Sequence, residues 1–138
     1  MDCRIVFYSA RKTSLCERAL KKSFSELGLT LANTSFATEC TGLGAVLINA
    51  FKKYNLVFVI GGLCFDDYRS IKKIISNAVA DTKIDDYKKL ENKTGSDGYV
   101  LRAQNQILVL LPDEPEQIEN IMQGNIRGYI KIYNKVEV

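Results

Sequence analysis

The sequence predicts an α/β fold, a three-layer sandwich in which helices cover both faces of a mostly parallel central sheet. Over residues 4–80, short apolar or β-branched runs alternate with stretches of helical periodicity. Successive strands joined by crossover helices pair in parallel, with right-handed connections. Two strand-like runs at residues 99–102 and 107–111 are separated only by a short turn, which predicts one antiparallel hairpin in the C-terminal half.

The first strand and the first helix are predicted within residues 4–28. Residues 4–8 are rich in β-branched and aromatic side chains, which suits a central strand. Ser14 and Glu17 then have the spacing of a capping box, and apolar residues follow at helical intervals up to Leu27. Gly28 is expected to end this helix in the left-handed conformation.

The next strand, helix and strand complete the parallel part of the sheet. Residues 29–33 alternate apolar and polar side chains and predict a short edge strand, which Thr34 and Ser35 are expected to break. Residues 41–54 have an apolar helical face. Residues 56–60 are an unbroken apolar run and are therefore expected in the middle of the sheet.

The remaining elements are less regular. An amphipathic helix is predicted over residues 67–80, and one short helix around residues 84–90 in the polar stretch that follows. After the hairpin, Asp113 and Glu116 again have capping-box spacing and Pro115 suits a first helical turn, so a last helix is expected there. Residues 128–133 have a period of two and predict a terminal strand.

The two glycines that follow the central strand are the first candidate for a functional site. Gly61 and Gly62 have no Cβ atom, so a ligand can closely approach the peptide N–H groups at the carboxyl end of that strand. The helix predicted next adds unpaired N–H groups and a positive dipole end, which favour a phosphate or another anion. Asp66 or Asp67 could instead cap that helix and satisfy the same donors, so a tight turn with an aspartate cap is the alternative.

The loop after the first strand is the second candidate. If the two strands are parallel, its residues lie at the same edge of the sheet as the glycine turn. These residues are polar and comprise Ser9, Arg11, Lys12 and Thr13. The alternative is that they form only a solvated loop and a helix cap.

Length, charge and composition restrict the class of protein. With 138 residues, 46% of them hydrophobic, the chain is expected to form a single domain over residues 1–138. The net charge of +3 includes no contiguous basic stripe with interleaved aromatic residues, so a nucleic-acid polymer is not expected as a partner. The chain has no histidine, which excludes a Ser-His-Asp relay and histidine-ligated zinc.

The cysteines and the N-terminus indicate a cytoplasmic protein. The four cysteines are widely spaced without a C-x-x-C pair, as expected of free thiols in a reducing compartment. The N-terminus has no signal-peptide pattern, and no apolar stretch is long enough to cross a bilayer. We therefore expect a soluble chain without a membrane partner.

Two motifs at matching separation resemble the molybdopterin-binding domain family of molybdenum-cofactor biosynthesis proteins, above all the N-terminal domain of CinA-type competence/damage-inducible proteins. That family has Gly-Gly-Leu-Gly-Pro-Thr-x-Asp-Asp-x-Thr after an apolar strand, and residues 61–69 read Gly-Gly-Leu-Cys-Phe-Asp-Asp-Tyr-Arg. The family also has Leu-Pro-Gly-x-Pro after a strand hairpin, where residues 111–115 read Leu-Pro-Asp-Glu-Pro. The resemblance covers most of the chain.

This resemblance implies the ligand and the roles of individual residues. Family members bind a pterin phosphate or a nucleotide at this edge, and some adenylylate molybdopterin with magnesium. The resemblance assigns Gly61 and Gly62 to phosphate contact and places Ser9 near the pocket. It assigns Asp66 and Asp67 to catalysis and to a magnesium ion, for which two carboxylates with phosphate oxygens are suitable ligands. By the same resemblance, Pro112 lies in the ligand-binding loop.

Three functions follow as alternatives. The first is a domain that binds molybdopterin, another phosphorylated pterin or a nucleotide, with catalysis left open. The second is a degenerate scaffold that acts through oligomerisation, as a trimer or a dimer, or through partner binding, because Cys64 and Asp113 replace glycines of the family. The third, by analogy of fold alone, is a hydrolase of nucleotide diphosphates.

Overall fold

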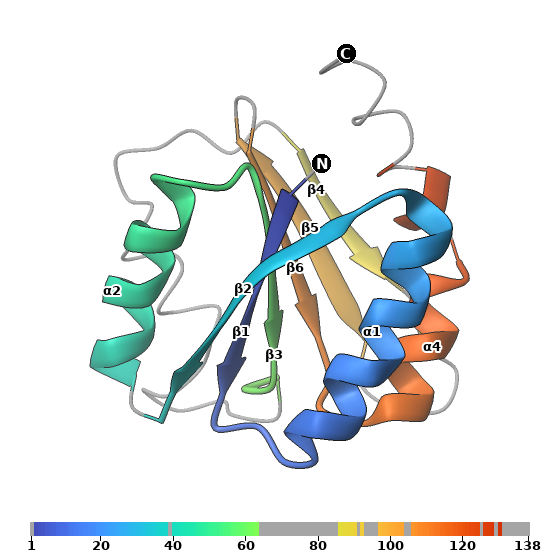
Figure 1. Cartoon of the computed structure of the whole chain (residues 1–138), viewed down its shortest axis with the longest axis horizontal. Coiled ribbons are helices and arrows are strands. Elements are labelled where there is room, and N and C mark those ends of the chain that lie inside the picture. The colour runs from blue at the N-terminus through green and yellow to red at the C-terminus, as the bar shows by residue number, and fades with distance from the viewer. Residues whose placement is uncertain are drawn as a thin grey trace.

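The computed structural model describes residues 2–38, 40–63, 86–90, 92, 97–103, 106–124, 126–128 and 130. Helices and strands alternate through the first half of the chain, and a strand hairpin and a helix follow in the second half (Figure 1). In order, the elements are β1 (Asp2–Tyr8), α1 (Thr13–Leu27), β2 (Thr30–Ala37), α2 (Cys40–Phe51), β3 (Leu56–Ile60), β4 (Asp86–Leu90), β5 (Gly98–Ala103), β6 (Gln106–Leu111) and α4 (Pro115–Met122).

The six strands form one sheet in the order β2-β1-β3-β6-β5-β4. The pairs β1–β2, β1–β3 and β3–β6 are parallel, whereas β5 runs antiparallel to both β6 and β4. The predicted α/β fold with a mostly parallel sheet and one antiparallel hairpin in the C-terminal half is thus confirmed. The hairpin is formed by β5 and β6, as the sequence predicts.

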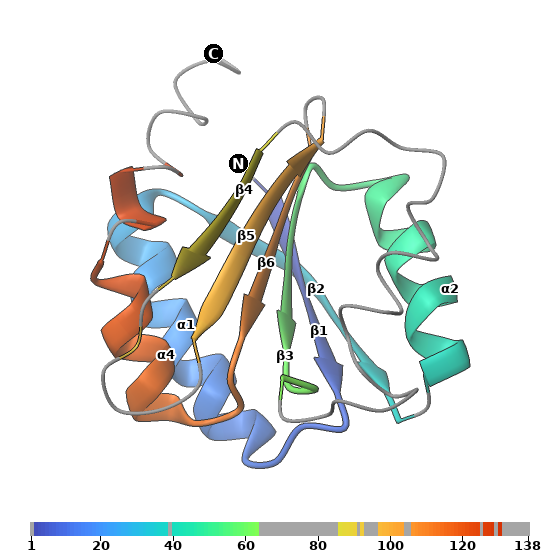
Figure 2. The same ribbon diagram turned by 180° about the vertical axis from the view of Figure 1, so that it is seen from behind.

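Helices cover both faces of the sheet, which makes three layers. Helices α1 and α4 lie side by side on one face and α2 lies on the other (Figure 2). β3 is buried on both sides, because Phe58 packs with the α1 and α4 side of the core while Val57 and Val59 pack with the α2 side. The ring centroids of Phe24 and Phe58 are 4.9 Å apart. The central position predicted for residues 56–60 is confirmed.

The second strand is longer than predicted. β2 continues through Thr34 and Ser35 to Ala37, and these residues pair with β1 in regular parallel register. The expected break is therefore wrong. The neighbouring strand supplies hydrogen-bond partners, and these outweigh the turn propensity of Thr and Ser. The register shifts once, between Cys3 and Arg4 of β1.

Two predictions of secondary structure in the second half of the chain are also wrong. Within the short helix expected at residues 84–90, the structure has strand β4, which pairs antiparallel with β5. A terminal strand is expected at residues 128–133, but residues 128 and 130 are helical, as are residues 126 and 127 before them. In both places tertiary context overrides a weak local pattern. The helix predicted at residues 67–80 lies outside the described residues.

Neither capping box forms, although both helices begin close to where the sequence places them. α1 begins at Thr13, behind Lys12 in the left-handed conformation, and no side chain caps it. α4 begins with Pro115 at its N-terminus, as predicted, but its N-cap residue is Glu114, which makes no side-chain cap bond. The carboxylate of Asp113 instead accepts a hydrogen bond from another loop. At the other end of α1, Gly28 has φ 72° and donates its N–H to the Phe24 carbonyl, as expected.

Candidate functional site at the carboxyl edge of the sheet

Three loops meet where the parallel strands β1, β3 and β6 end. Phe7 pairs with Ile60, and Ile60 pairs with Leu111, so these strands end level with one another. The loops that follow are residues 9–12, 61–63 and 112–114, and α1 and α4 begin directly behind the first and the third (Figure 1). Open α/β sheets bind ligands at this edge.

Gly61 is required by a close approach between two loops. Its φ of 104° is one that other residues rarely adopt, and a Cβ atom there would lie 2.3 Å from the Tyr8 carbonyl oxygen and 3.2 Å from the Ala10 Cβ atom. Its N–H donates a hydrogen bond of 3.0 Å to the Leu111 carbonyl. The Gly61 amide therefore ties β3 to β6 and is not open to a ligand.

Gly62 differs from its neighbour. It also has positive φ, 79°, and it is buried. Within the part of the chain that the structure describes, no acceptor pairs with its N–H. Of the two adjacent glycines, Gly62 is the one whose amide can donate to a bound anion.

Ser9 and Lys12, in the loop after β1, have an unusual backbone conformation. Their φ angles are 46° and 53°, and among the described residues they are the ones other than glycine with positive φ. This conformation costs about 1–2 kcal/mol per residue. The loop is held against β2, because the Ser9 N–H donates to the Ala37 carbonyl at 2.9 Å and the Ser9 hydroxyl donates to the Thr38 carbonyl at 3.2 Å.

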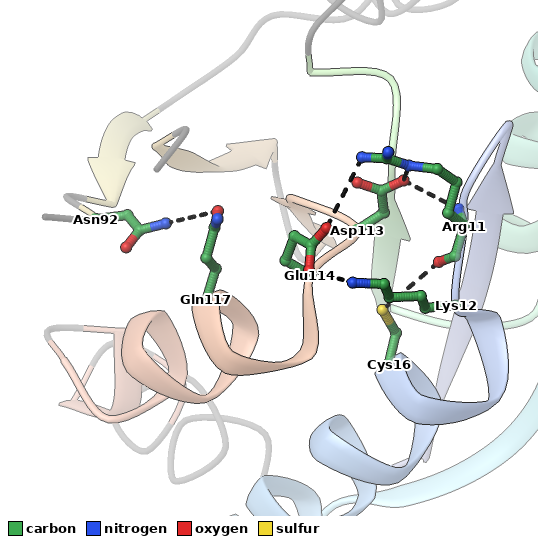
Figure 3. A network of polar contacts seen from close by, with 7 residues as sticks. All are labelled: Arg11, Lys12, Cys16, Asn92, Asp113, Glu114 and Gln117. Carbon is green, nitrogen blue, oxygen red and sulfur yellow. Dashed lines mark hydrogen bonds and ion pairs between the residues drawn. The ribbon is translucent and has the colours of Figure 1, made fainter. Parts of the chain in front are cut away.

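Three ion pairs join the loop after β1 to the loop after β6 (Figure 3). Asp113 accepts a hydrogen bond from the Arg11 backbone N–H at 2.9 Å and another from the Arg11 Nε at 3.3 Å. Lys12 Nζ lies 2.9 Å from a carboxylate oxygen of Glu114, and an Arg11 Nη2 lies 3.8 Å from the other. Asp113 thus occupies an amide of the first loop in the way that a bound anion would.

The ion pairs are weak enough to exchange. The Arg11 side chain is 74% exposed and that of Lys12 is 50% exposed. Exposed pairs of this kind contribute only about 0–1 kcal/mol each, because water screens them. The two cations are therefore available to a ligand that offers a stronger negative charge than a single carboxylate.

Cys16 lies behind these ion pairs, and its thiol is shielded from solvent. Its side chain is buried in the first turn of α1. Burial, followed by the negative charges of Asp113 and Glu114, raises the pKa of the Cys16 thiol to about 11. Burial also raises the pKa of Cys3 to about 12. Both cysteines are free and protonated near neutral pH.

The structure gathers part of the predicted site at one edge. Ser9, Gly61, Gly62 and Pro112 each follow a strand that ends there. Asp66 and Asp67, predicted for catalysis and for magnesium, lie outside the described residues, as does Cys64. In the described part of the chain, no three His, Cys, Asp or Glu side chains are placed to hold a metal ion.

The pairing of Arg11 and Lys12 with Asp113 and Glu114 is what the sequence does not reveal. The partners in each pair, Arg11 with Asp113 and Lys12 with Glu114, are 102 positions apart along the chain. The one local signal, a capping-box spacing at Asp113, predicts a different bond. A cavity of about 710 Å³ lies beside this cluster, between α1 and α4, and is lined by Lys12 and Glu114 among others. Neither Gly61 nor Gly62 lines it.

No protein-family model matches the sequence, and no curated protein matches it. Solved structures do match over nearly the whole chain. The protein CinA from Thermoplasma acidophilum, described as of unknown function, has a TM-score of 0.74 at 11% identity, with 94% of this chain and 97% of that chain covered. A molybdopterin biosynthesis protein from Mycobacterium abscessus has a TM-score of 0.70 at 12% identity, with 98% and 95% covered.

The molybdopterin biosynthesis enzyme MoaB from Thermus thermophilus has a TM-score of 0.66 at 13% identity, with 94% of this chain and 96% of that chain covered. Identities this low establish the arrangement of the backbone and nothing finer. No helix among the described residues is both long and apolar enough to span a bilayer.

These structural matches show that the chain has the α/β fold that is shared by CinA and the molybdopterin biosynthesis proteins.

Proposed function

We propose that the carboxyl edge of the sheet binds a phosphorylated small molecule, either molybdopterin or another phosphorylated pterin, or a nucleotide. The observation that carries this proposal is where the unusual backbone conformations lie. Among the described residues, those with positive φ are Gly28, which ends a helix, and four residues at this edge. The four are Ser9, Lys12, Gly61 and Gly62. For the two residues other than glycine, Ser9 and Lys12, this conformation is strained, and such strain clusters at ligand sites.

Each residue has a role that follows from its contacts. The Gly62 N–H donates to a phosphate oxygen, and Arg11 supplies the positive charge. The Ser9 hydroxyl, which has a single O–H, donates to phosphate by exchanging the bond that it gives to the Thr38 carbonyl. Gly61 shapes the turn, since its own amide is bonded to Leu111. Pro112, buried after β6, sets the direction of the third loop.

The ligand must compete with Asp113. Its carboxylate already accepts the Arg11 N–H, so phosphate binding requires that Arg11 exchange one anion for another. A dianionic phosphate with three acceptor oxygens makes more charged hydrogen bonds than a carboxylate at the same place. Asp66 and Asp67, with the phosphate oxygens, are the magnesium ligands in this proposal. Their carboxylates are also the candidates for any turnover.

Titration calorimetry tests the proposal. The protein is titrated with ADP, ATP and a molybdopterin precursor, each with and without magnesium, and binding of at least one of them at submillimolar concentration is the expected result. A tighter interaction in magnesium is expected for the wild type and is lost when Asp66 and Asp67 are both replaced by Asn. Absence of heat with every ligand at millimolar concentration contradicts the proposal.

A second candidate is a scaffold that acts through self-assembly or a partner. It is favoured by the two anion-binding amides that the chain itself engages, those of Gly61 and Arg11. Light scattering decides whether the chain is a dimer or a trimer, and a strict monomer removes self-assembly. For either candidate we place the protein in the cytoplasm, because Cys3 and Cys16 are free thiols.

A further inference from the structure

The two edge strands of the sheet differ in how they resist pairing with another chain. β4 carries charged residues, among them the exposed Lys88 and Lys89. Charges on an edge strand, lysine above all, discourage a further strand from adding to the sheet. β2, at the opposite edge, has the sequence Thr-Leu-Ala-Asn-Thr-Ser-Phe-Ala, without a charge or a proline over eight residues. No described strand pairs with its outer side.

Beneath β2 lies a buried cation, for which the described residues supply no anionic partner. Arg4 of β1 is only 8% exposed. Its Nε donates a hydrogen bond of 2.9 Å to the Ser35 hydroxyl of β2, and its Nη2 donates to the same oxygen. Among the residues that the structure describes, no carboxylate contacts this guanidinium.

One hydroxyl oxygen cannot satisfy a guanidinium. The group has five N–H donors, and a hydroxyl has only two acceptor lone pairs. A cation removed from water without a counter-charge is among the most costly groups to bury. Asn33 pairs with Arg4 in the register of the sheet, but its amide oxygen accepts the Thr34 N–H at 2.7 Å, whereas the guanidinium bonds to Ser35. Within the described part of the chain, Arg4 therefore lacks the carboxylate that its environment favours.

The other face of β2 offers an apolar contact. Phe36 is 64% exposed, and its ring stacks on Phe7 with centroids 5.3 Å apart. Phe36 pairs with Phe7 in the register of the sheet, and Ser35 pairs with Val6. Because successive residues of a strand point to opposite faces, the apolar ring lies on the α1 side and the cation on the α2 side.

We propose that the outer edge of β2 binds an extended acidic peptide segment of another protein, which adds a strand to the sheet. Backbone hydrogen bonds supply affinity and the two faces supply specificity. A carboxylate of the peptide pairs with Arg4 on the α2 side, and an apolar residue at an adjacent position packs on Phe36. The site requires neither of the glycines nor any ion pair at the carboxyl edge, so it is independent of the phosphate site proposed above.

A second copy of this chain fits the same edge less well. Its β2 strand carries no carboxylate that could pair with Arg4. Antiparallel pairing of two β2 strands would also bring a second buried guanidinium to the interface, and like charges at close range are unfavourable. Charge complementarity thus favours an acidic peptide.

Two blocked heptapeptides test the proposal on the full chain. Both alternate valine and threonine, with a valine on each side of the central residue, and both carry the same neutral fluorophore. The central residue is glutamate in one and glutamine in the other. Fluorescence anisotropy is expected to show that the glutamate peptide binds about tenfold more tightly. This ratio is measured on the wild type, so it does not depend on whether a variant folds. Equal affinities, or binding of neither peptide at millimolar concentration, overturn the proposal.

Two variants locate the site. Arg4→Met is expected to reduce the tenfold ratio to about one, whereas Arg4→Lys, which keeps the charge, retains most of it. Phe36→Lys, which places a charge on the edge, is expected to weaken both peptides at least fivefold. An unchanged ratio in Arg4→Met contradicts the proposal. So does sedimentation of the wild type as a dimer that Phe36→Lys dissociates, since this assigns the edge to a second copy.

Discussion

Arg4 and Arg11 lie near the two ends of β1, and they differ in burial and in charge balance. The Arg11 side chain is 74% exposed and has a carboxylate partner, Asp113. Arg4 is 8% exposed, and the one side-chain partner that the described residues give it is the Ser35 hydroxyl. An exposed ion pair is cheap to break, whereas a buried cation without a counter-charge is costly to keep. The first arrangement suits exchange with a small anion, and the second suits a permanent or tightly bound partner.

The largest expected effect concerns Gly61, which packs closely against the loop that carries Arg11. Gly61→Ala places a Cβ atom 2.3 Å from the Tyr8 carbonyl oxygen at a φ of 104°. We expect the free energy of unfolding to fall by about 3 kcal/mol, from the combined cost of overpacking and left-handed backbone. Urea denaturation measures it. Gly28→Ala, where no atom lies within 4 Å, is the matched control and should lose only about 1 kcal/mol.

The next effect separates the two arginines directly. Arg4→Met replaces a buried cation by an apolar side chain of similar length and is expected to raise the free energy of unfolding by about 1–2 kcal/mol. Arg11→Met, at an exposed position, should change it by less than about 0.5 kcal/mol. If Arg4→Met instead destabilises the protein by more than about 1 kcal/mol, the guanidinium has an anionic partner and the comparison fails.

Removing the Asp113 carboxylate should strengthen the binding of a ligand anion to Arg11. Asp113→Asn is expected to tighten ADP binding about threefold to tenfold, because the ligand no longer displaces a charged group. Calorimetric titration gives the dissociation constant. Glu26→Gln removes a negative charge whose partner is Arg127, distant from this edge, and serves as the control for net charge. An equal increase in ADP affinity in both variants would show that the effect comes from net charge and not from the pairing of Asp113 with Arg11.

The smallest effect is the pH dependence from Cys16. Its pKa is about 11 in the folded chain and 9.0 when unperturbed. A raised folded pKa stabilises the protein fully below the unfolded value, and this contribution is lost as the pH rises from about 9 to about 11. The stability of wild type should therefore decline more steeply across that interval than the stability of Cys16→Ala. Parallel declines would show that the thiol is more accessible than its burial indicates.

The sequence predicts the fold better than it predicts the contacts at the site. The apolar run of β3 and the two strand-like runs of the hairpin are visible in the local sequence. For β3 the reason is burial on both faces, which requires apolar residues throughout. The extension of β2 through Thr34 and Ser35 is not, since the partner that stabilises it, β1, is distant in the sequence. The same is true of β4, where pairing with β5 outweighs the helical pattern.

The candidate site shows the same limit at the level of single residues. Gly61 and Gly62 are indistinguishable in the sequence, yet one amide is bonded to Leu111 and the other is not bonded within the described residues. Likewise, Asp113 has the spacing of a helix cap but pairs with Arg11. Local spacing cannot tell which of several donors a carboxylate will reach once the chain has folded.

The most direct measurement is the response of three backbone amides to ligand. In a nitrogen–proton correlation spectrum of the labelled protein, titration with ADP and magnesium is expected to shift the Gly62 and Arg11 resonances strongly. The Gly61 resonance should move little, because its N–H remains bonded to the Leu111 carbonyl. If the largest shifts fall on residues remote from these loops, or if none of the three amides responds at saturating ligand, the sheet edge is not the binding site.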